Sequence, residues 1–320
     1  MNEQRVASID AFRGFAVICM VIGNFLLGLV WIPTWLKHAP DIGFTFVDLG
    51  APAFVFVIGL NYVTSARRRL GKDGALQMTE HFVVRYFAIL GIGALFGAGQ
   101  ALFQINGVTV NWGVLQAIGT AGLVTLIFIR LPTWQRLLIG LGLLAVYQVM
   151  LDKFWLRTVL ASPHGGMYGS LSWSALLILS TVLADLYYQP KNGFLKLLGV
   201  SSLSILAALL LMGWCVISKN RVSATYILLT LGLSGWFFCL FTVLIDRLGW
   251  QLAWFRTWGR NPLLLYVLSL LLQGLLTLPL AGRFGAQTPA WLVFVQVALL
   301  LGVLTGLAGL LDRRKMFISI

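Results

Sequence analysis

Three polar side chains within the first 50 residues could do chemistry together: Asn24, His38 and Asp48. Histidine can take a proton from a nucleophile at neutral pH, because its unperturbed pKa lies close by. A nearby carboxylate can orient the imidazole and stabilise its charged form, and an amide can donate a hydrogen bond to a developing oxyanion. Such a set suits acyl transfer to an amine or a hydroxyl group.

The sequence offers no obvious protein nucleophile for this chemistry. It contains no Gly-x-Ser-x-Gly motif, and no cysteine lies near His38. We therefore expect direct transfer in a ternary complex, with His38 as general base, and no covalent intermediate. The sequence also lacks a metal-ligand cluster and a dinucleotide or phosphate-loop fingerprint, so we expect no metal.

Each residue of this set also has a plainer interpretation. Asp48 could only cap the helix that follows it, Asn24 could only bond a neighbouring helix, and His38 could be solvated in its loop. His164 is a rival base, predicted on the same side of a membrane as His38, although the sequence shows no partner near it. Asp185, close to the end of an apolar stretch, could take part or merely pair with a cation.

The elements that must position these residues are membrane spans. Of the 320 residues, 59% are hydrophobic and 10% are charged, against roughly 25% charged in soluble domains. This composition excludes an ordinary soluble globule, a disordered chain and a nucleic-acid-binding module. The net charge of +13 is instead typical of Lys and Arg concentrated on one face of a membrane.

A spanning helix needs about 20 mostly apolar residues. The sequence contains ten such stretches, near Gly14–Trp31, Val47–Ser65, Phe82–Phe103, Val108–Ile129, Leu137–Leu151, Leu171–Leu186, Leu195–Ile217, Ala224–Ile245, Asn261–Leu280 and Trp291–Leu311. We therefore predict an all-α, polytopic integral membrane helix bundle of about ten transmembrane helices, forming a single domain over residues 1–320.

An even number of spans puts both termini on one side. If that side is the cytoplasm, most of the 23 Lys and Arg residues lie inside, as the positive-inside rule requires. His38 then lies on the outer side, between the first two spans. The polar start Met1–Asp10 runs straight into the first span, and no clear small-residue cleavage site lies before the next span. We therefore expect the first span to be retained.

Charged residues also stand at the predicted inner end of the first span. Asp10 and Arg13 are spaced to share one helix face, and Arg256 and Arg260 precede the ninth span. They could anchor the helices at the interface, or they could hold the phosphates of a cytosolic acyl donor.

The run Gln116–Ala121 matches the (Arg/Gln)-x-x-Gly-x-(Gly/Ala) pattern of soluble acetyltransferases that bind acetyl-CoA. That motif needs a turn between a strand and a helix, whereas this run lies inside an apolar span. We interpret the match as chance, and keep Gln116 as a polar group at membrane depth.

The order of motifs resembles the heparan-α-glucosaminide N-acetyltransferase family of membrane acyltransferases. The family has the pattern Arg-x-x-Ser-(Ile/Leu/Val)-Asp-x-Phe-Arg-Gly, followed by an Asn in the first span. A Lys-His-Ala run and an Asp ten residues after its His come next. This sequence contains each of these features in the same order. Weaker matches follow along the chain. The matching segments are Arg5–Gly14, Asn24, Lys37–Ala39, Asp48, Pro52–Gly59, Gly113–Gln116 with Gly119, Lys219–Asp246 and Gly259–Asn261 with Tyr266.

The resemblance implies an acetyl group passed from cytosolic acetyl-CoA, the co-substrate, to an amino sugar or related glycan on the opposite side. It places the catalytic histidine at His38, with Asn24 and Asp48 beside it. We expect the acetyl-CoA site to include Asp10, Arg13, Gln116, Arg260, Asn261 and Tyr266. It further implies membrane lipids around the bundle, no nucleic-acid partner, a homodimer, and, for a bacterial member, the plasma (inner) membrane.

Two features leave alternatives open. The flanks of the Gly-Val-Leu-Gln run are Asn111-Trp112 and Ala117, where the family often has arginines, and an outer acidic stretch is replaced around His164. The sequence alone therefore does not identify the acceptor. A small-solute transporter lined by Asn24 and Asp48 is the alternative function, although we detect no inverted repeats.

Overall fold

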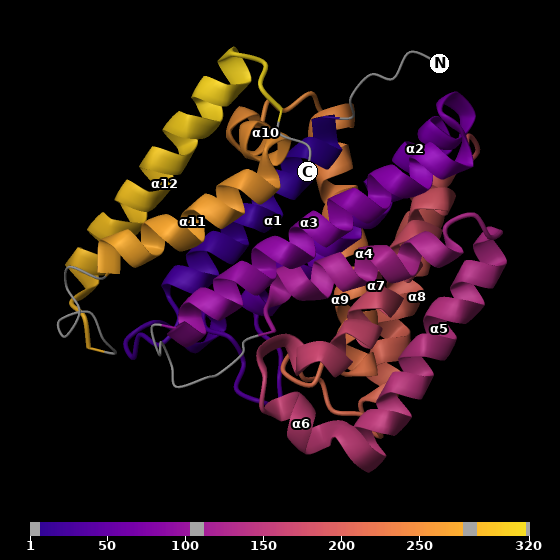
Figure 1. Cartoon of the computed structure of the whole chain (residues 1–320), viewed down its shortest axis with the longest axis horizontal. Coiled ribbons are helices and arrows are strands. Elements are labelled where there is room, and N and C mark those ends of the chain that lie inside the picture. Colours follow the sequence, from indigo (N-terminus) through magenta and orange to yellow (C-terminus); the bar gives the residue numbers. More distant parts are fainter. Residues whose placement is uncertain (1–6, 103–111, 278–286, 318–320) are drawn as a thin grey trace. The chain divides into compact units, whose positions relative to one another are not determined.

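The computed structural model describes residues 7–102, 112–277 and 287–317, and its regular elements in these ranges are all helical (Figure 1). The α-helices are α1 (Ala7–Phe25), α2 (Gly50–Lys72), α3 (Gly74–Leu102), α4 (Val114–Phe128), α5 (Thr133–Met150), α6 (Leu156–Leu160), α7 (Gly166–Tyr187), α8 (Gly193–Leu211), α9 (Ala224–Phe241), α10 (Ala253–Arg260), α11 (Pro262–Thr277) and α12 (Ala290–Arg313). Single helical turns join them, namely η1 (Thr34–Leu36), η2 (Phe46–Leu49), η4 (Leu151–Trp155), η5 (Pro163–Gly165) and η6 (Thr242–Arg247).

Eight helical segments in the described ranges are long and apolar enough to cross a membrane, and a ninth is obtained if α10 and α11 count as one bent span. The prediction of an all-α, multi-pass membrane protein is confirmed. The expected ten spans become eight or nine because α4 has only 15 residues, fewer than the about 20 that a span needs. The ninth expected span starts at an 89° bend between α10 and α11.

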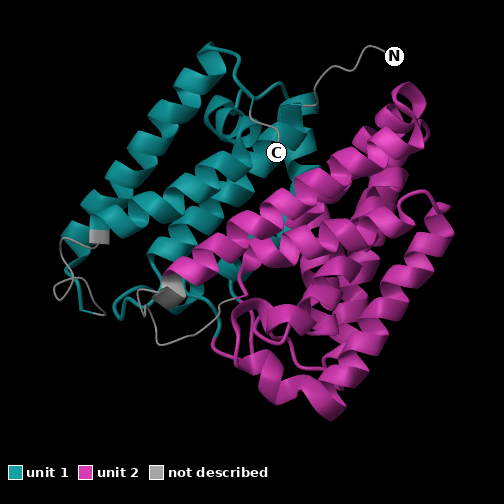
Figure 2. Cartoon of the chain, in the orientation of Figure 1, with its two compact units in different colours: residues 1–39, 45–54, 237–319 teal, residues 40–44, 55–236, 320 magenta. Residues whose placement is uncertain are grey.

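The chain forms two compact units (Figure 2). Unit 1 comprises residues 1–39, 45–54 and 237–319, and unit 2 comprises residues 40–44, 55–236 and 320. The loop between α1 and α2 is thus shared, because its middle five residues belong to unit 2 and its flanks belong to unit 1. Each unit has its own central helix.

Helix α1 is the centre of unit 1. Its apolar side chains are buried, and the rings of Phe12 and Phe15 each lie 5.4 Å from that of Phe241. Glycines allow α1 and α10 to touch along their backbones: a methyl group on Gly14 or on Gly259 would overlap main-chain atoms of the other helix. Helix α10 is therefore held tightly against the N-terminal half of α1.

Helix α7 is the centre of unit 2, where it packs against α4, α5 and α8. Two of its buried hydroxyl groups donate to carbonyl oxygens of their own helix, Ser174 to Ser170 and Ser180 to Leu176. Because their hydroxyl groups are satisfied within the protein, these two serines are tolerated at membrane depth.

Burial separates inner helices from helices with an open apolar face. In the most apolar 18-residue segment of each helix, 83% of α7 and 72% of α1 is buried inside the protein. The corresponding shares for α8 and α12 are 22% and 28%. The open faces carry large apolar side chains, among them Leu203 and Leu210 of α8 and Phe294 of α12. Such faces suit contact with lipid tails and would be unusual in water.

Candidate active site

His38 and Asp48 form a side-chain pair in unit 1. Nδ1 of His38 lies 2.7 Å from Oδ1 of Asp48. The other carboxylate oxygen accepts hydrogen bonds from the main-chain nitrogen of Ala39 at 3.2 Å and that of Thr45 at 3.0 Å. The Thr45 hydroxyl adds a fourth contact at 3.1 Å. The loop between Ala39 and Thr45 therefore closes on one carboxylate.

The local sequence explains why this loop folds around Asp48. Thr45 and Asp48 are three residues apart and form a capping box at the start of η2, in which each residue satisfies a backbone N–H that the helix start leaves open. Asp48 thus does cap the helix, as its plainer interpretation proposed. It also binds His38, so that interpretation accounts for only part of its contacts.

Burial of Asp48 defines the chemical state of the pair. The Asp48 side chain is fully buried and the His38 side chain is 22% exposed. A buried carboxylate is costly unless it is paired or hydrogen-bonded, and the contacts above meet that need. Since a carboxylate only accepts, Nδ1 carries the hydrogen of this contact, and Nε2 is the ring nitrogen that remains for proton exchange.

Asn24 and Tyr266 form a second pair in the same unit. The Asn24 side-chain nitrogen donates to the Tyr266 hydroxyl at 3.3 Å. At the same place Gln273 donates to the main-chain oxygen of Asn24 at 3.2 Å, one of the carbonyls that the end of a helix leaves without an intrahelical partner. Asn24 therefore bonds α11, as the plainer interpretation of an interhelical bond proposed.

The two pairs are carried by elements that pack on each other. Gly23 of α1 faces Val47 of η2 so closely that a methyl group at position 23 would lie 2.5 Å from Cγ1 of Val47. One turn earlier, Met20 packs against Gly50 at the start of α2. Asn24 directly follows Gly23 in the chain, and Asp48 directly follows Val47, so the Gly23–Val47 contact lies beside both residues.

The charged residues Asp10 and Arg13 lie at the opposite end of α1. Arg13 donates to Asp10 at 3.3 Å and to the main-chain oxygen of Gly259 at 2.8 Å. Fourteen residues separate Asp10 from Asn24, which corresponds to about 21 Å along a helix. Because α1 is a candidate span, this ion pair and the His38–Asp48 pair belong to opposite ends of a membrane helix.

Arg260 and Asn261 stand at the bend between α10 and α11. Arg260 is ion-paired with Asp312 of α12, and the Asn261 side chain donates to the main-chain oxygen of Met316 at 3.1 Å. Both residues thereby tie the bend to the end of α12. Both also lie in the same unit as Asp10 and Arg13.

Gln116 belongs to unit 2 and contacts none of the other candidates through a described hydrogen bond. Its side chain accepts from the main-chain nitrogen of Gly113 at 3.0 Å and donates to the oxygen of Gly93 at 2.8 Å. It thereby caps α4 and ties it to α3. The run Gln116–Ala121 is helical throughout, without the turn that a soluble acetyl-CoA motif requires.

The two further residues raised by the sequence also lie in unit 2. His164 has a left-handed backbone conformation with φ of 55°, and its main-chain oxygen accepts from Trp173 at 3.2 Å. Asp185 is bonded by Arg67 and Thr133 and forms an ion pair with the buried Arg136. Asp185 therefore has the surroundings of a structural ion-pair network.

Sequence reasoning missed two partners of the candidate residues. Thr45 could have been found, because a Thr three residues before an acidic residue at a helix start is the pattern of a capping box. Tyr266 was expected at the acetyl-CoA site, which stays a prediction, and its hydroxyl accepts a hydrogen bond from Asn24. Nothing in the sequence indicates that contact, since 242 positions separate the two residues.

A family model described as heparan-alpha-glucosaminide N-acetyltransferase, catalytic, matches residues 5–217, more than half of the chain. Among curated relatives, the heparan-alpha-glucosaminide N-acetyltransferase of Mus musculus is 32% identical over 95 residues, which cover 29% of this chain and 14% of that protein. The Homo sapiens protein of the same name is 46% identical over 55 residues, 17% of this chain and 8% of that protein. The chain thus aligns with less than a sixth of either relative.

Proposed function

This chain belongs to the family of the heparan-alpha-glucosaminide N-acetyltransferase catalytic domain, and from that membership we propose that it is a membrane-bound acetyltransferase. The proposed reaction moves an acetyl group from cytosolic acetyl-CoA to an amino sugar or related glycan on the other side of the membrane. The observation that carries the proposal is the 2.7 Å contact of Nδ1 of His38 with the buried Asp48 carboxylate, from which we assign Nε2 of His38 as the base.

In the proposed step the acceptor amine attacks the thioester carbonyl carbon of acetyl-CoA. A carbon–nitrogen bond forms, the carbon–sulfur bond breaks, and the thiolate of CoA leaves. Nε2 of His38 takes the proton that the amine loses. Asp48, bonded through Nδ1, orients the ring and stabilises the imidazolium that results.

Asn24 supplies a donor for the oxyanion that develops on the thioester oxygen. An amide nitrogen carries two hydrogens, of which one is directed to Tyr266. The second hydrogen is the one we assign to the oxyanion. Tyr266 then acts by holding the amide of Asn24 in a fixed orientation.

The phosphates of acetyl-CoA would meet the cations at the other end of α1. We assign Arg13, Asp10, Arg260 and Asn261 to this end, because Arg13 bonds both Asp10 and the main-chain oxygen of Gly259, the residue that directly precedes Arg260 and Asn261. Guanidinium groups are suited to phosphates through paired hydrogen bonds. The assignment of Gln116 to the acetyl-CoA site stays a prediction from the sequence.

This proposal orients the protein with both termini in the cytoplasm. Its support is the positive-inside rule applied to the ten apolar stretches of the sequence. We place the protein in the plasma membrane of a bacterium, and protease protection of inverted membrane vesicles tests the orientation directly.

The experiment that tests the function uses the purified protein in liposomes, with labelled acetyl-CoA and a panel of amino sugars. We expect His38→Gln to lower the rate of acetyl transfer by about 10²- to 10⁴-fold, the usual contribution of a general base. His81→Gln is the matched control, because His81 lies on α3 of unit 2 and should leave the rate unchanged.

Two results would contradict the proposal. If folded His38→Gln protein keeps the wild-type rate, His38 is not the base. If the wild-type protein transfers no acetyl group to any acceptor but moves solutes across the liposome membrane, the protein is a transporter.

A further inference from the structure

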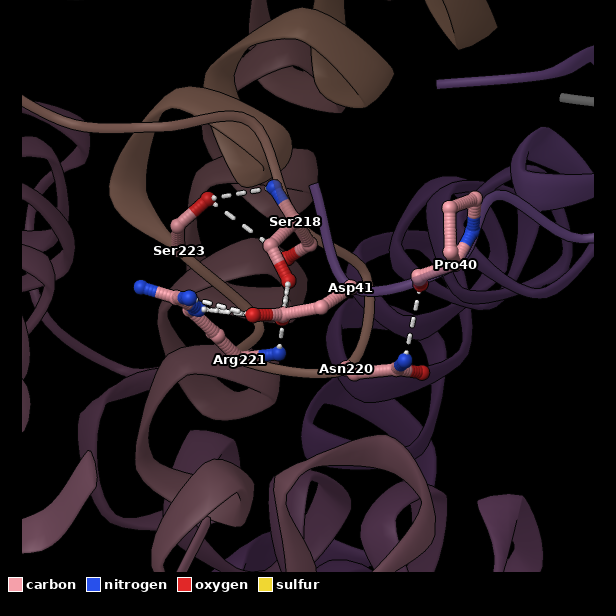
Figure 3. A network of polar contacts seen from close by, with 6 residues as sticks. All are labelled: Pro40, Asp41, Ser218, Asn220, Arg221 and Ser223. Carbon is pink, nitrogen blue, oxygen red and sulfur yellow. Dashed lines mark hydrogen bonds and ion pairs between the residues drawn. The ribbon is translucent and has the colours of Figure 1, made fainter. Parts of the chain in front are cut away.

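The middle of the loop that carries His38 is bound by a turn nearly 180 residues further along the chain (Figure 3). The Asp41 carboxylate accepts from Nε of Arg221, 3.0 Å from each carboxylate oxygen, and is ion-paired with Nη2 of the same side chain. Ser218 donates to the same carboxylate at 3.0 Å. We call this group of three side chains the clamp.

Main-chain contacts strengthen the clamp on both sides of Asp41. Asn220 donates to the main-chain oxygen of Pro40 at 2.9 Å, and the nitrogen of Gly43 donates to the oxygen of Ile217 at 2.9 Å. The segment 40–44 is thus fixed at three successive points. A single ion pair could not define its conformation in this way.

The turn that holds the segment is itself fixed to the helices of unit 2. Tyr147 of α5 donates to the main-chain oxygen of Arg221 at 2.6 Å, and Ser172 of α7 donates to that of Val222 at 2.7 Å. Val222 has a φ of 49° although it is β-branched, a conformation that persists only where the surroundings impose it. The turn that binds residues 40–44 is therefore itself held rigidly by α5 and α7.

The clamped segment is flanked by the groups that hold the catalytic pair. Residues 40–44 belong to unit 2, while Ala39 and Thr45 belong to unit 1. The main-chain nitrogens of these two flanking residues both donate to Oδ2 of Asp48. His38 precedes the first of them. A change in the path of residues 40–44 would therefore move the two main-chain N–H groups that donate to Asp48.

Resting on the proposed function, we propose that Asp41 and Arg221 are positioning residues that hold His38 in its catalytic orientation through the loop 38–48. An ion pair at a partly exposed site contributes little to stability, so stability alone does not account for a paired contact with this geometry. Orientation does, because small displacements of a catalytic group can lower a rate by about 10²-fold.

The clamp remains charged at neutral pH. The Arg221 guanidinium beside Asp41 holds the pKa of that carboxyl below its usual value, and Asp41 in turn raises the pKa of Arg221. Both groups lie in loops outside the candidate spans. Protonation therefore does not release the segment under the conditions in which acetyl transfer would run.

The test is a set of variants measured for both rate and loop order. Asp41→Asn and Arg221→Gln should each lower kcat by about 10-fold or more and leave KM for acetyl-CoA unchanged. The double variant should be no worse than either single variant, because both remove the same contact. The charge exchange Asp41→Arg with Arg221→Asp should recover part of the rate.

Hydrogen exchange of the main-chain amides of Ala39 and Thr45 is the second measurement, and it does not require catalysis. Exchange should become faster in both single variants. Arg157→Gln is the matched control, since Arg157 is an exposed arginine of unit 2 outside the clamp. This control should change neither kcat nor exchange.

The results separate this inference from the proposed function. Unchanged kcat in folded single variants, single effects that add in full in the double variant, or unchanged exchange at Ala39 and Thr45 would overturn the inference. A wild-type protein without acetyl transfer, whose loop nevertheless exchanges faster in the variants, would overturn the proposed function and leave the clamp as the element that orders the loop.

Discussion

Asn24 and Tyr266 share a hydrogen bond of 3.3 Å although 242 residues separate them in the sequence. The bond joins the last turn of α1 to α11, and it directs one amide hydrogen of Asn24 to a fixed acceptor. In unit 1 this bond stands beside the contact of Gly23 with Val47, which sets α1 against the turn that carries Asp48. The arrangement leads to the following expectations.

Asn24→Ala should lower kcat by about 10²- to 10³-fold, the loss measured when an oxyanion donor is removed. Tyr266→Phe removes only the hydroxyl that orients the amide, so we expect about a threefold to tenfold loss, equivalent to one neutral hydrogen bond. The double variant should resemble Asn24→Ala alone. Steady-state kinetics of the four proteins check this, and fully additive losses would show that Tyr266 acts independently of Asn24.

Asp48→Asn should lower kcat by about 10⁴-fold with the loop still folded, because an amide can present N–H to Nδ1 and favour the wrong tautomer of His38. The measurement is acetyl transfer together with the amide signals of Ala39 and Thr45, whose nitrogens donate to Asp48. A variant with an intact loop and an undiminished rate would remove Asp48 from the mechanism.

Gly23→Ala should destabilise the protein by about 1–3 kcal/mol, because its methyl group would lie 2.5 Å from Cγ1 of Val47 in a packed interior. Adding Val47→Ala should recover part of the lost stability by making room. Gly91→Ala on α3 is the control, since that site has open space and the change should be neutral or favourable in a helix. Thermal unfolding in detergent compares the three variants, and equal stability of Gly23→Ala and wild type would contradict the close contact.

Arg260→Ala should raise KM for acetyl-CoA if its guanidinium holds a phosphate. Asp312→Ala removes the carboxylate partner of Arg260 and should leave that KM unchanged or lower it, because the cation is retained. Binding of CoA by calorimetry checks both variants. If both weaken CoA binding to the same extent, the pair acts only by tying α10 to α12.

The clamp should add an acid-sensitive contribution to stability. The folded-state pKa of Asp41 lies below its ordinary value of 3.8, so its contribution is present above that pH and is lost as pH falls through the lowered pKa. The carboxylate is about one-third exposed, which limits the effect to within about 1 kcal/mol. Unfolding of wild type and Asp41→Asn across this range should converge at low pH, and parallel curves would contradict the linkage.

Local patterns in the sequence determined the class of the protein and half of its candidate site. Apolar stretches of sufficient length predict membrane helices because the bilayer imposes a length and forbids unpaired backbone groups. The ten-residue spacing of His38 and Asp48 allowed a loop to close on the carboxylate, and the structure contains that closed loop. Both inferences depend only on residues near one another in the chain.

Tertiary structure decided the remaining relationships. Asn24 meets Tyr266, and Asp41 meets Arg221, across 242 and 180 positions respectively, and the ninth expected span begins at an 89° bend that hydropathy does not indicate. Contacts of this kind arise when helices pack, and packing depends on the shapes of all the surfaces involved. The pattern of hydropathy along the chain does not predict which helices become neighbours.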